Sequence, residues 1–277
     1  MSKIKRKQVC DNDMTHIPNR LEIQNASVGY GEKTVLHELD FQIPHGARVA
    51  VVGPNGAGKS TLFKALVGLL PLQKGRILIH GESLRTHKDC VAYVPQREDV
   101  DWRFPVTVHD VVMMGRYGQM GWLSRASRHD HEVVLRSLEQ MGIANLADKS
   151  IGQLSGGQQQ RAFLARALAQ EPHILLMDEP FTGVDVTTQE ATFTLLDHLR
   201  EREVTTLIST HDLNLAASRF DLALLLNHRL ISFGEPRLAF QQENLQRAFG
   251  SSLLVMENGT LLVDECCPPD EQFTIGH

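Results

Sequence analysis

Several features are scarce or missing in this sequence of 277 residues, and each absence narrows the choice of function. No apolar run approaches the roughly 20 residues that a helix needs to cross a bilayer. The densest apolar stretches, residues 174–177 and 222–226, have the length of buried strands. A basic excess is also missing, because the formal net charge is −5. We therefore expect the chain to stay outside the bilayer, and the charge argues against a protein built to bind nucleic acid.

Cysteine is scarce, and its positions show no disulfide framework. The four cysteines are Cys10, Cys90, Cys266 and Cys267. Such scattered spacing fits a reducing cytosol. The adjacent pair Cys266 and Cys267, in a chain with 13 histidines, suggests a metal site, but a simple tail before Pro268 is the better interpretation. The basic residues near the start precede no apolar segment, so residues 1–19 are expected to be a flexible leader rather than a secretory signal.

The remaining sequence alternates between strand and helix patterns. Predicted strands cover 21–24, 39–43, 47–52, 75–80, 90–94, 174–178, 205–209, 222–226, 229–233, 253–257 and 260–264. Predicted helices cover 60–69, 108–114, 129–141, 157–170, 187–202 and 242–249. Alternating buried strands and helices predict a largely parallel α/β sheet.

A glycine-rich run follows the predicted strand 47–52 and precedes the predicted helix 60–69. It consists of Gly53, Pro54, Asn55, Gly56, Ala57, Gly58, Lys59, Ser60 and Thr61, which matches the P-loop pattern. Its glycines let the backbone turn so that N–H groups face phosphate oxygens, and the helix adds its positive N-terminal end. Lys59 supplies a charge for the β- and γ-phosphates and Ser60 a hydroxyl for Mg²⁺. The run therefore predicts binding of ATP with Mg²⁺.

Two successive acids, Asp178 and Glu179, stand at the end of the predicted strand 174–178. Asp178 stands at the carboxyl end of a buried strand, where P-loop proteins place an acid that helps to hold Mg²⁺. Glu179 follows directly, and an acid at that position can orient and deprotonate an attacking water as a general base. An apolar run ending in two acids is weak evidence alone, but it is strong behind a P-loop.

A third motif, Leu154, Ser155, Gly156, Gly157 and Gln158, resembles the signature of ATP-binding cassette (ABC) proteins. Further positions resemble landmarks of that family in the expected order. Tyr30 resembles the aromatic that stacks on adenine, and Gln96 the glutamine that contacts Mg²⁺ and water and links to the membrane partner. Asp185 resembles the acid of the loop that crosses the dimer interface. His211 resembles the histidine that contacts the γ-phosphate.

The resemblance covers about residues 20–250 and implies a fold and a mechanism. It implies a P-loop NTPase (RecA-like) core with an antiparallel β subdomain and an inserted α-helical subdomain at about 97–170, followed by C-terminal strands and a tail at 251–277. It also implies a homodimer, in which the signature motif of one copy completes the ATP site of the other. The ATPase pair would drive a separate integral membrane permease from the cytoplasmic face of a bacterial inner membrane, as a peripheral subunit.

Each landmark also has a simpler interpretation. Tyr30 could be a surface aromatic, and Gln96 a polar loop residue. His211 could cap the helix that follows it, and Asp185 could be a helix N-cap. The joint order of the motifs is what favours the functional interpretation.

The segment between Gln96 and the signature indicates the cargo class. It contains Trp102, Tyr117 and Trp122, and aromatic residues are enriched at protein interfaces, although these could instead pack the core of the helical subdomain. The amino-acid sequence of this segment resembles that of the ATPases of importers for manganese, zinc or chelated iron, with manganese favoured. In such systems an extracytoplasmic protein binds the metal, so this chain would contact the cargo only indirectly.

Three rival functions remain. A cassette protein of DNA repair would carry long coiled-coil arms between the P-loop and the signature, and residues 96–154 are too short and lack heptads. A degenerate cassette that only senses ATP would lack Glu179 or His211. A transporter for another cargo, such as a siderophore or haem, is the most serious alternative.

Overall fold

The computed structural model describes residues 19–96, 102, 104–120, 125–250, 253–255 and 261–263. Residues 1–18 of the predicted leader, Trp122 and the pair Cys266 and Cys267 lie outside these residues, whereas Asn19, the last residue of that leader, begins the first strand. Within the described part, no helix combines the length and apolar character needed to span a bilayer.

The larger sheet has six strands in the order β10-β9-β3-β8-β7-β6. Its strands are β3 (Arg48–Val52), β6 (Val91–Val94), β7 (Ile174–Met177), β8 (Thr205–Thr210), β9 (Leu222–Asn227) and β10 (Arg229–Gly234). Every neighbouring pair is parallel except β9 and β10, which form a hairpin. Strands β3, β7 and β8 are buried at every position, as strands covered on both faces should be, and in β8 the buried residues include the hydroxyl side chains of Thr205, Thr206, Ser209 and Thr210. The predicted parallel sheet is confirmed.

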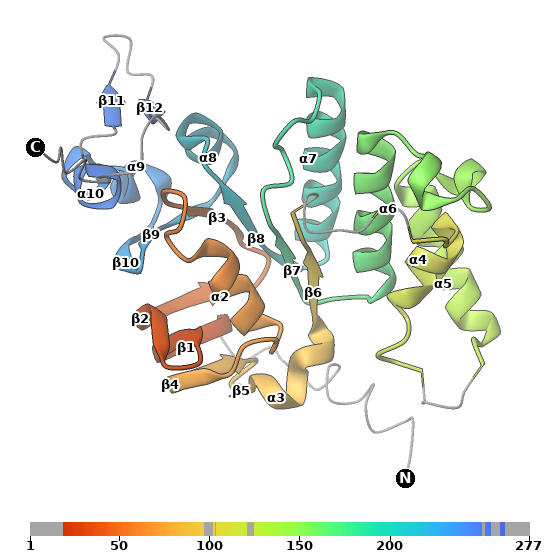
Figure 1. The fold of residues 1–277 in the computed structure, drawn as a ribbon, viewed down its shortest axis with the longest axis horizontal. Coiled ribbons are helices and arrows are strands. Elements are labelled where there is room, and N and C mark those ends of the chain that lie inside the picture. The colour runs from red at the N-terminus through yellow and green to blue at the C-terminus, as the bar shows by residue number, and fades with distance from the viewer. Residues whose placement is uncertain are drawn as a thin grey trace, which may run out of the picture.

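A second, antiparallel sheet packs beside the first and has the order β2-β1-β4-β5. Its strands are β1 (Asn19–Tyr30), β2 (Lys33–Pro44), β4 (Leu72–Ile79) and β5 (Glu82–Ser83). Helix α2 (Lys59–Leu66) shares one apolar core with this sheet and with β3. Figure 1 shows α2 beside β1 and β2. Because α2 starts directly after the glycine-rich loop, this core fixes the position of the loop.

The helices α4 (Val108–Met114), α5 (Arg128–Gln140) and α6 (Gly156–Ala169) pack on one another around a separate apolar core. Each begins at a capping box, in which Thr107, Ser127 or Ser155 accepts a hydrogen bond from the backbone three residues on. Figure 1 shows this helical group at the far side of β6 and β7 from α2. Helix α7 (Val186–Glu201) lies between it and β8 in the same view.

The remaining elements are short. They are α3 (Leu84–His87), α8 (Leu213–Arg219), α9 (Pro236–Ala239), α10 (Gln242–Phe249), β11 (Leu253–Val255) and β12 (Leu261–Val263), together with 3-10 turns at Lys88–Cys90, Ala144–Leu146 and Ile151–Gln153. The sequence did not predict α3, α8, α9 or β5. Cys90 is disulfide-bonded in the structure, which its irregular spacing did not predict.

Arg116, just beyond α4, ties the three-helix group together from a buried position. Its Nε lies 3.1 Å from Asp130 Oδ1, and one terminal nitrogen donates to Ala169 O at 2.8 Å and to Glu171 Oε2 at 3.0 Å. The Arg116 side chain is 3% exposed and that of Asp130 is 11% exposed. Burial raises the pKa of Asp130, but hydrogen bonds from Ser127 and Arg116 outweigh it and hold the pKa below its usual value.

Replacing Arg116 with methionine should therefore destabilise the protein by about 3–5 kcal/mol, because the change leaves a buried carboxylate without its cation. Thermal unfolding should show it as a fall in Tm of roughly 10 °C. The matched control is Arg128→Ala, since Arg128 pairs with Glu132 on the surface and is 94% exposed. That control should change stability by less than about 1 kcal/mol. Equal effects of the two substitutions would contradict a structural role for Arg116.

Candidate ATP site

The glycine-rich loop has the backbone geometry that a phosphate cradle requires. Gly56 and Gly58 have positive φ angles of 79° and 100°, which side chains disfavour. A Cβ on Gly58 would lie 2.4 Å from Leu36 Cδ2, and one on Gly53 would lie 2.1 Å from Leu226 O. The loop thus packs tightly between β2 and β9. Its position just before α2 places its N–H groups at the positive N-terminal end of this helix, where an anion can bind.

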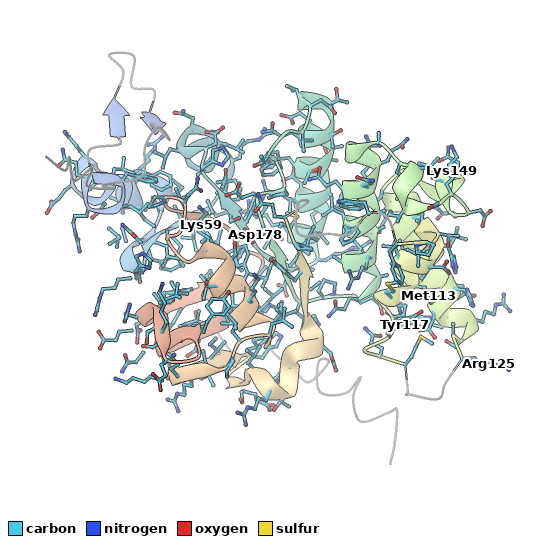
Figure 2. The ribbon with its side chains drawn as sticks, viewed as in Figure 1. Lys59, Met113, Tyr117, Arg125, Lys149 and Asp178 are labelled. Carbon is cyan, nitrogen blue, oxygen red and sulfur yellow. The ribbon has the colours of Figure 1, made fainter. Side chains whose placement is uncertain are left out.

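Lys59 is the first residue of α2 and is only 6% exposed. Its Nζ donates to Gly53 O at 2.8 Å and to Pro54 O at 3.3 Å. The same nitrogen lies 3.8 Å from Glu179 Oε1. The loop therefore orients this cation toward the acids at the end of β7, and Figure 2 shows Lys59 and Asp178 close to each other near the middle of the molecule.

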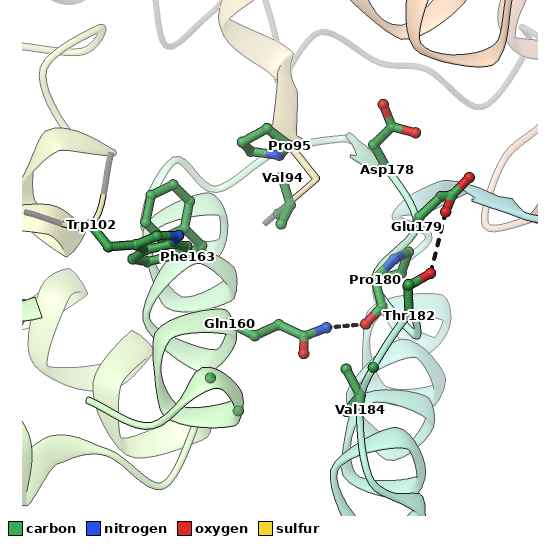
Figure 3. A pocket seen from close by; sticks show the side chains of 13 residues that line it. Val94, Pro95, Trp102, Gln160, Phe163, Asp178, Glu179, Pro180, Thr182 and Val184 are labelled. Atoms are coloured by element: carbon green, nitrogen blue, oxygen red, sulfur yellow. Dashed lines mark hydrogen bonds between the residues drawn. The ribbon is translucent and has the colours of Figure 1, made fainter. Parts of the chain in front are cut away.

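Asp178 and Glu179 leave β7 in succession, as the sequence predicts, but their side chains have different surroundings. Asp178 is 3% exposed and accepts hydrogen bonds from Ser209 Oγ at 2.6 Å and from Tyr93 Oη at 3.3 Å. Glu179 has a positive φ of 46°, an uncommon conformation for a residue with a side chain. Such backbone strain is concentrated at functional sites. Figure 3 shows the two carboxylates at the end of the strand.

The Glu179 carboxylate lies between two cationic or potentially cationic groups. Lys59 approaches one oxygen, and His211 Nδ1 lies 3.6 Å from the other. Thr182 Oγ1 also donates to Glu179 Oε2 at 3.2 Å. His211 is half exposed, and Asp212 rather than His211 caps α8, so the capping interpretation of His211 is wrong. The structure thus brings Lys59, Glu179 and His211 to one place.

The signature residues stand at the N-terminus of α6. Ser155 is the N-cap, and its hydroxyl accepts from Gln158 N at 3.4 Å while its own N–H donates to Gln158 Oε1 at 3.0 Å. Leu154 is buried, whereas Ser155 is exposed and Gly156 and Gly157 are partly exposed. The Gln158 side chain therefore serves the helix start in this structure, and the Ser155 hydroxyl remains at the surface.

A pocket opens between the start of α6 and the loop after β7. Gly156, Gly157 and Gln160 line one side, and Glu179, Pro180 and Thr182 line the other. Gln160 Nε2 donates to Pro180 O and so ties the two sides together. Figure 3 shows this bond, with Trp102 and Phe163 at the far end of the pocket. The signature helix is thus coupled directly to the loop that follows Glu179.

The other predicted landmarks lie at the edges of this region. Tyr30 ends β1 and is 49% exposed. Gln96 follows Pro95, two residues beyond the end of β6, and is half-buried. Asp185 is the N-cap of α7, where its Oδ1 accepts from Thr188 N at 2.9 Å, and this hydrogen bond lowers the pKa of Asp185. Asp185 is therefore a helix N-cap in this structure. It also lies on the surface, as a residue of a loop at a dimer interface must.

The oxygen groups near the loop suit a hard divalent cation. Ser60 contributes a partly exposed hydroxyl at the start of α2, and Asp178 contributes a carboxylate at the end of β7. Mg²⁺ prefers oxygen ligands and commonly uses one or two protein groups together with substrate phosphates. These residues therefore fit Mg²⁺, and the glycine cradle beside them fits the phosphates.

Sequence reasoning missed Tyr93, Ser209 and Thr182, which hold the two acids. One signal was available for Ser209, a polar residue near the carboxyl end of the buried strand β8. Nothing in the sequence pattern indicated that Tyr93 or Thr182 would reach the acids.

A profile of the ABC transporter family matches residues 36–182, more than half of the chain. The chain belongs to this family. Membership makes it an ATP-binding ATPase whose hydrolysis is coupled to transport.

Individual relatives are similar over most of their length. The manganese transport system ATP-binding protein of Bacillus subtilis is 46% identical, covering 87% of this chain and 96% of the relative. The zinc transport system ATP-binding protein of Treponema pallidum is also 46% identical, covering 84% of this chain and 88% of the relative. A chelated iron transport system protein of Yersinia pestis is 43% identical, covering 90% of this chain and 85% of the relative.

Solved structures confirm the predicted fold class. An inward-facing transporter described as an ABC system of the metal-chelate type aligns with a TM-score of 0.75 at 28% identity, covering 88% of this chain and 97% of the matched chain. The ADP form of an ATP-binding cassette aligns with a TM-score of 0.72 at 23% identity, covering 84% of this chain and 99% of that one. The core with its antiparallel and helical parts is therefore the ABC ATPase fold.

Proposed function

We propose that this chain is the ATPase of an importer for a divalent transition metal, with manganese favoured over zinc and chelated iron. The observation that carries the proposal is the 46% identity to a manganese and to a zinc transport system ATP-binding protein over more than four fifths of the chain. An ATPase serving another cargo, such as a siderophore or haem, is the alternative. The structural similarity to a transporter of the metal-chelate type keeps that alternative open.

Two copies of the chain would bind ATP between them. The glycine-rich loop of one copy would hold the phosphates, and the α6 N-terminus of the other would offer Ser155 and the N–H groups of Gly156 and Gly157. The exposed Ser155 hydroxyl supports this arrangement, as does the surface position of Asp185. ATP favours the closed pair only through contacts with both copies, so its hydrolysis lets the pair reopen. Tyr30 would stack on the adenine.

Within each site, we assign the residues separate roles in phosphate binding, Mg²⁺ binding and activation of water. Lys59 binds the β- and γ-phosphates, and Mg²⁺, held by Ser60, Gln96 and Asp178, would neutralise phosphate charge. Glu179 acts as the general base on water, and its placement beside His211 and Lys59 supports that role. His211 contacts the γ-phosphate and, through its 3.6 Å approach to Glu179, keeps that carboxylate oriented.

The membrane connection would come from a partner. Residues 20–250 form the ATPase domain in this proposal, with the helical subdomain at about 97–170 docking on an integral membrane permease at the cytoplasmic face of a bacterial inner membrane. Residues 251–277 would be an appendage, and an extracytoplasmic metal-binding protein would deliver the cargo. Trp102 packs on Phe163 with ring centroids 4.9 Å apart, so it serves the core of the helical subdomain at least in part. Tyr117, by contrast, is 57% exposed.

Replacing Tyr117 with alanine should weaken docking to the permease without changing ATP binding in solution. The exposed aromatic ring lies on the helical group, where Figure 2 places it beside Met113 and away from Lys59. Aromatic anchors at interfaces cost about 2 kcal/mol or more when truncated. Co-purification of the permease with the tagged ATPase from detergent-solubilised membranes measures the effect. Leu238→Ala, at a 59% exposed apolar site on α9 outside the helical subdomain, is the control; equal recovery of both variants would remove Tyr117 from the interface.

The cargo is tested by the manganese, zinc and iron contents of cells that lack the gene. We expect manganese to fall most in a deletion strain grown at low metal supply, and the wild-type gene to restore it. A deletion that lowers only zinc or only iron would assign that metal instead. Unchanged contents of all three, with loss of siderophore or haem uptake, would favour the alternative cargo.

A further inference from the structure

The carboxylate of Asp178 is held from both neighbouring strands. Ser209, on β8, donates to its Oδ1 at 2.6 Å, and Tyr93, on β6, donates through its hydroxyl to Oδ2 at 3.3 Å. Strands β8 and β6 flank β7 in the sheet, so the two hydroxyls approach the acid from opposite sides. Hydrogen bonds to a carboxylate are stronger than neutral ones, and two of them fix the plane of the group.

Ser209 has a second contact that links the two acids. Its Oγ accepts a hydrogen bond from the backbone N–H of Glu179 at 2.8 Å while it donates to Asp178. Ser209 has no exposed surface. Glu179 has the positive φ of 46°, and this strained conformation needs support from its surroundings. The hydrogen bond from its backbone N–H to Ser209 supplies such support. One buried hydroxyl therefore sets both the direction of the Asp178 carboxylate and the turn that presents Glu179.

Tyr93 connects the same acid to the phosphate loop. Its ring packs edge-on against Phe63 of α2, with ring centroids 6.3 Å apart. Phe63 is completely buried and lies in the helix that begins at Lys59. The Tyr93 ring is thus held by its packing against α2, the helix that carries Lys59 and Ser60. Because its hydroxyl donates to Asp178, Tyr93 links this acid to α2.

We propose that Ser209 and Tyr93 are positioning residues that fix Asp178 for Mg²⁺, and that Ser209 in addition fixes Glu179 for its role toward water. The inference rests on the function proposed above for these two acids. A partner that orients a metal ligand acts on metal affinity without contacting the substrate. Loss of either hydroxyl should therefore change the dependence on the divalent cation rather than the affinity for nucleotide alone.

The test compares Ser209→Ala, Tyr93→Phe and Ser209→Thr with the wild type in the full-length protein. Ser209→Ala should raise the Mg²⁺ concentration for half-maximal binding of a fluorescent ATP analogue by about tenfold or more. Binding of the analogue in EDTA should stay unchanged, and the EPR spectrum of Mn²⁺ added in place of Mg²⁺ should report the altered site. Tyr93→Phe should show a smaller rise because its hydrogen bond is longer. Ser209→Thr keeps a hydroxyl and should recover most of the affinity.

Thr206→Val is the matched control, because Thr206 lies on the same strand and is 2% exposed. It should leave the Mg²⁺ dependence unchanged, even where loss of its buried hydroxyl lowers Tm. The proposal is overturned if Ser209→Ala and Tyr93→Phe keep the wild-type Mg²⁺ dependence, or if they lose EDTA binding and Tm in parallel, as a purely structural role would require. If Ser209→Ala does not fold, Tyr93→Phe decides alone. A wild-type protein whose ATP turnover does not need Mg²⁺ would refute the proposed function itself.

Discussion

Replacing Glu179 with glutamine should nearly abolish ATP turnover and leave nucleotide binding intact. The amide keeps the size of the side chain and can still accept from Thr182, but it cannot take a proton from water. General-base catalysis typically contributes about 10²–10⁴-fold, so turnover should fall by at least 100-fold. Phosphate release measures the turnover, and a fluorescent nucleotide measures binding. Because the product state is no longer reached, ATP should also trap the paired form.

The control for this experiment is Glu190→Gln. Glu190 lies on α7, pairs with Arg219 on the surface, and is 61% exposed. Removing its charge should leave turnover within about twofold of the wild type, since exposed pairs contribute at most about 1 kcal/mol. A Glu179→Gln variant that hydrolyses ATP at close to the normal rate would exclude Glu179 as the base, whatever the control shows.

Replacing Lys59 with alanine should strongly weaken nucleotide binding itself. The ammonium group is nearly buried and is aimed by two loop carbonyls toward the place where the phosphates would lie. Truncating one partner of a buried charge pair costs about 2–5 kcal/mol, which raises the dissociation constant roughly 30-fold or more. The substitution also removes the cation 3.8 Å from Glu179. Titration calorimetry with ATP and Mg²⁺ measures the loss.

Lys64→Ala provides the matched control, because Lys64 lies in the last turn of the same helix and carries the same charge. It should bind ATP within a few-fold of the wild type, since helix-end charges contribute only about 0.3–1 kcal/mol. Equal losses in both variants would show that the helix, rather than the Lys59 charge at the loop, sets the affinity.

The parts of the fold that were predictable have strong local signals. Helices α4 and α10 have the predicted bounds, and the predicted strand 174–178 ends one residue early as β7. In α4, the pair Thr107 and Asp110 closes a capping box, so the sequence itself marks the helix start. The short elements α8 and α9 were not predictable. Helix α9 has only four residues, too few for an amphipathic period, and α8, although as long as α4, has no capping box to mark its start.

The candidate site divides in the same way. The glycine-rich loop and the acids after β7 are contiguous in sequence, so their residue types could be interpreted directly. The contacts of Ser209 and Tyr93 with Asp178 depend on which strands become neighbours, and β6 and β8 are far apart in the chain. The roles of Tyr30, Gln96 and the signature residues across a dimer stay predictions, because they concern contacts between two chains.

Crosslinking between the two nucleotide-binding motifs shows whether ATP is bound between two copies of the chain. A chain carrying one cysteine in place of Asn55 is mixed with a chain carrying one in place of the exposed Gln153, two residues before Ser155, with the native cysteines replaced, and a non-hydrolysable ATP analogue is added. We expect a crosslinked dimer that forms with the analogue and Mg²⁺ but not with ADP, and scattering that shows a matching twofold rise in mass. If no such dimer forms at saturating analogue, either in solution or on the membrane partner, ATP is not bound between two copies of the chain.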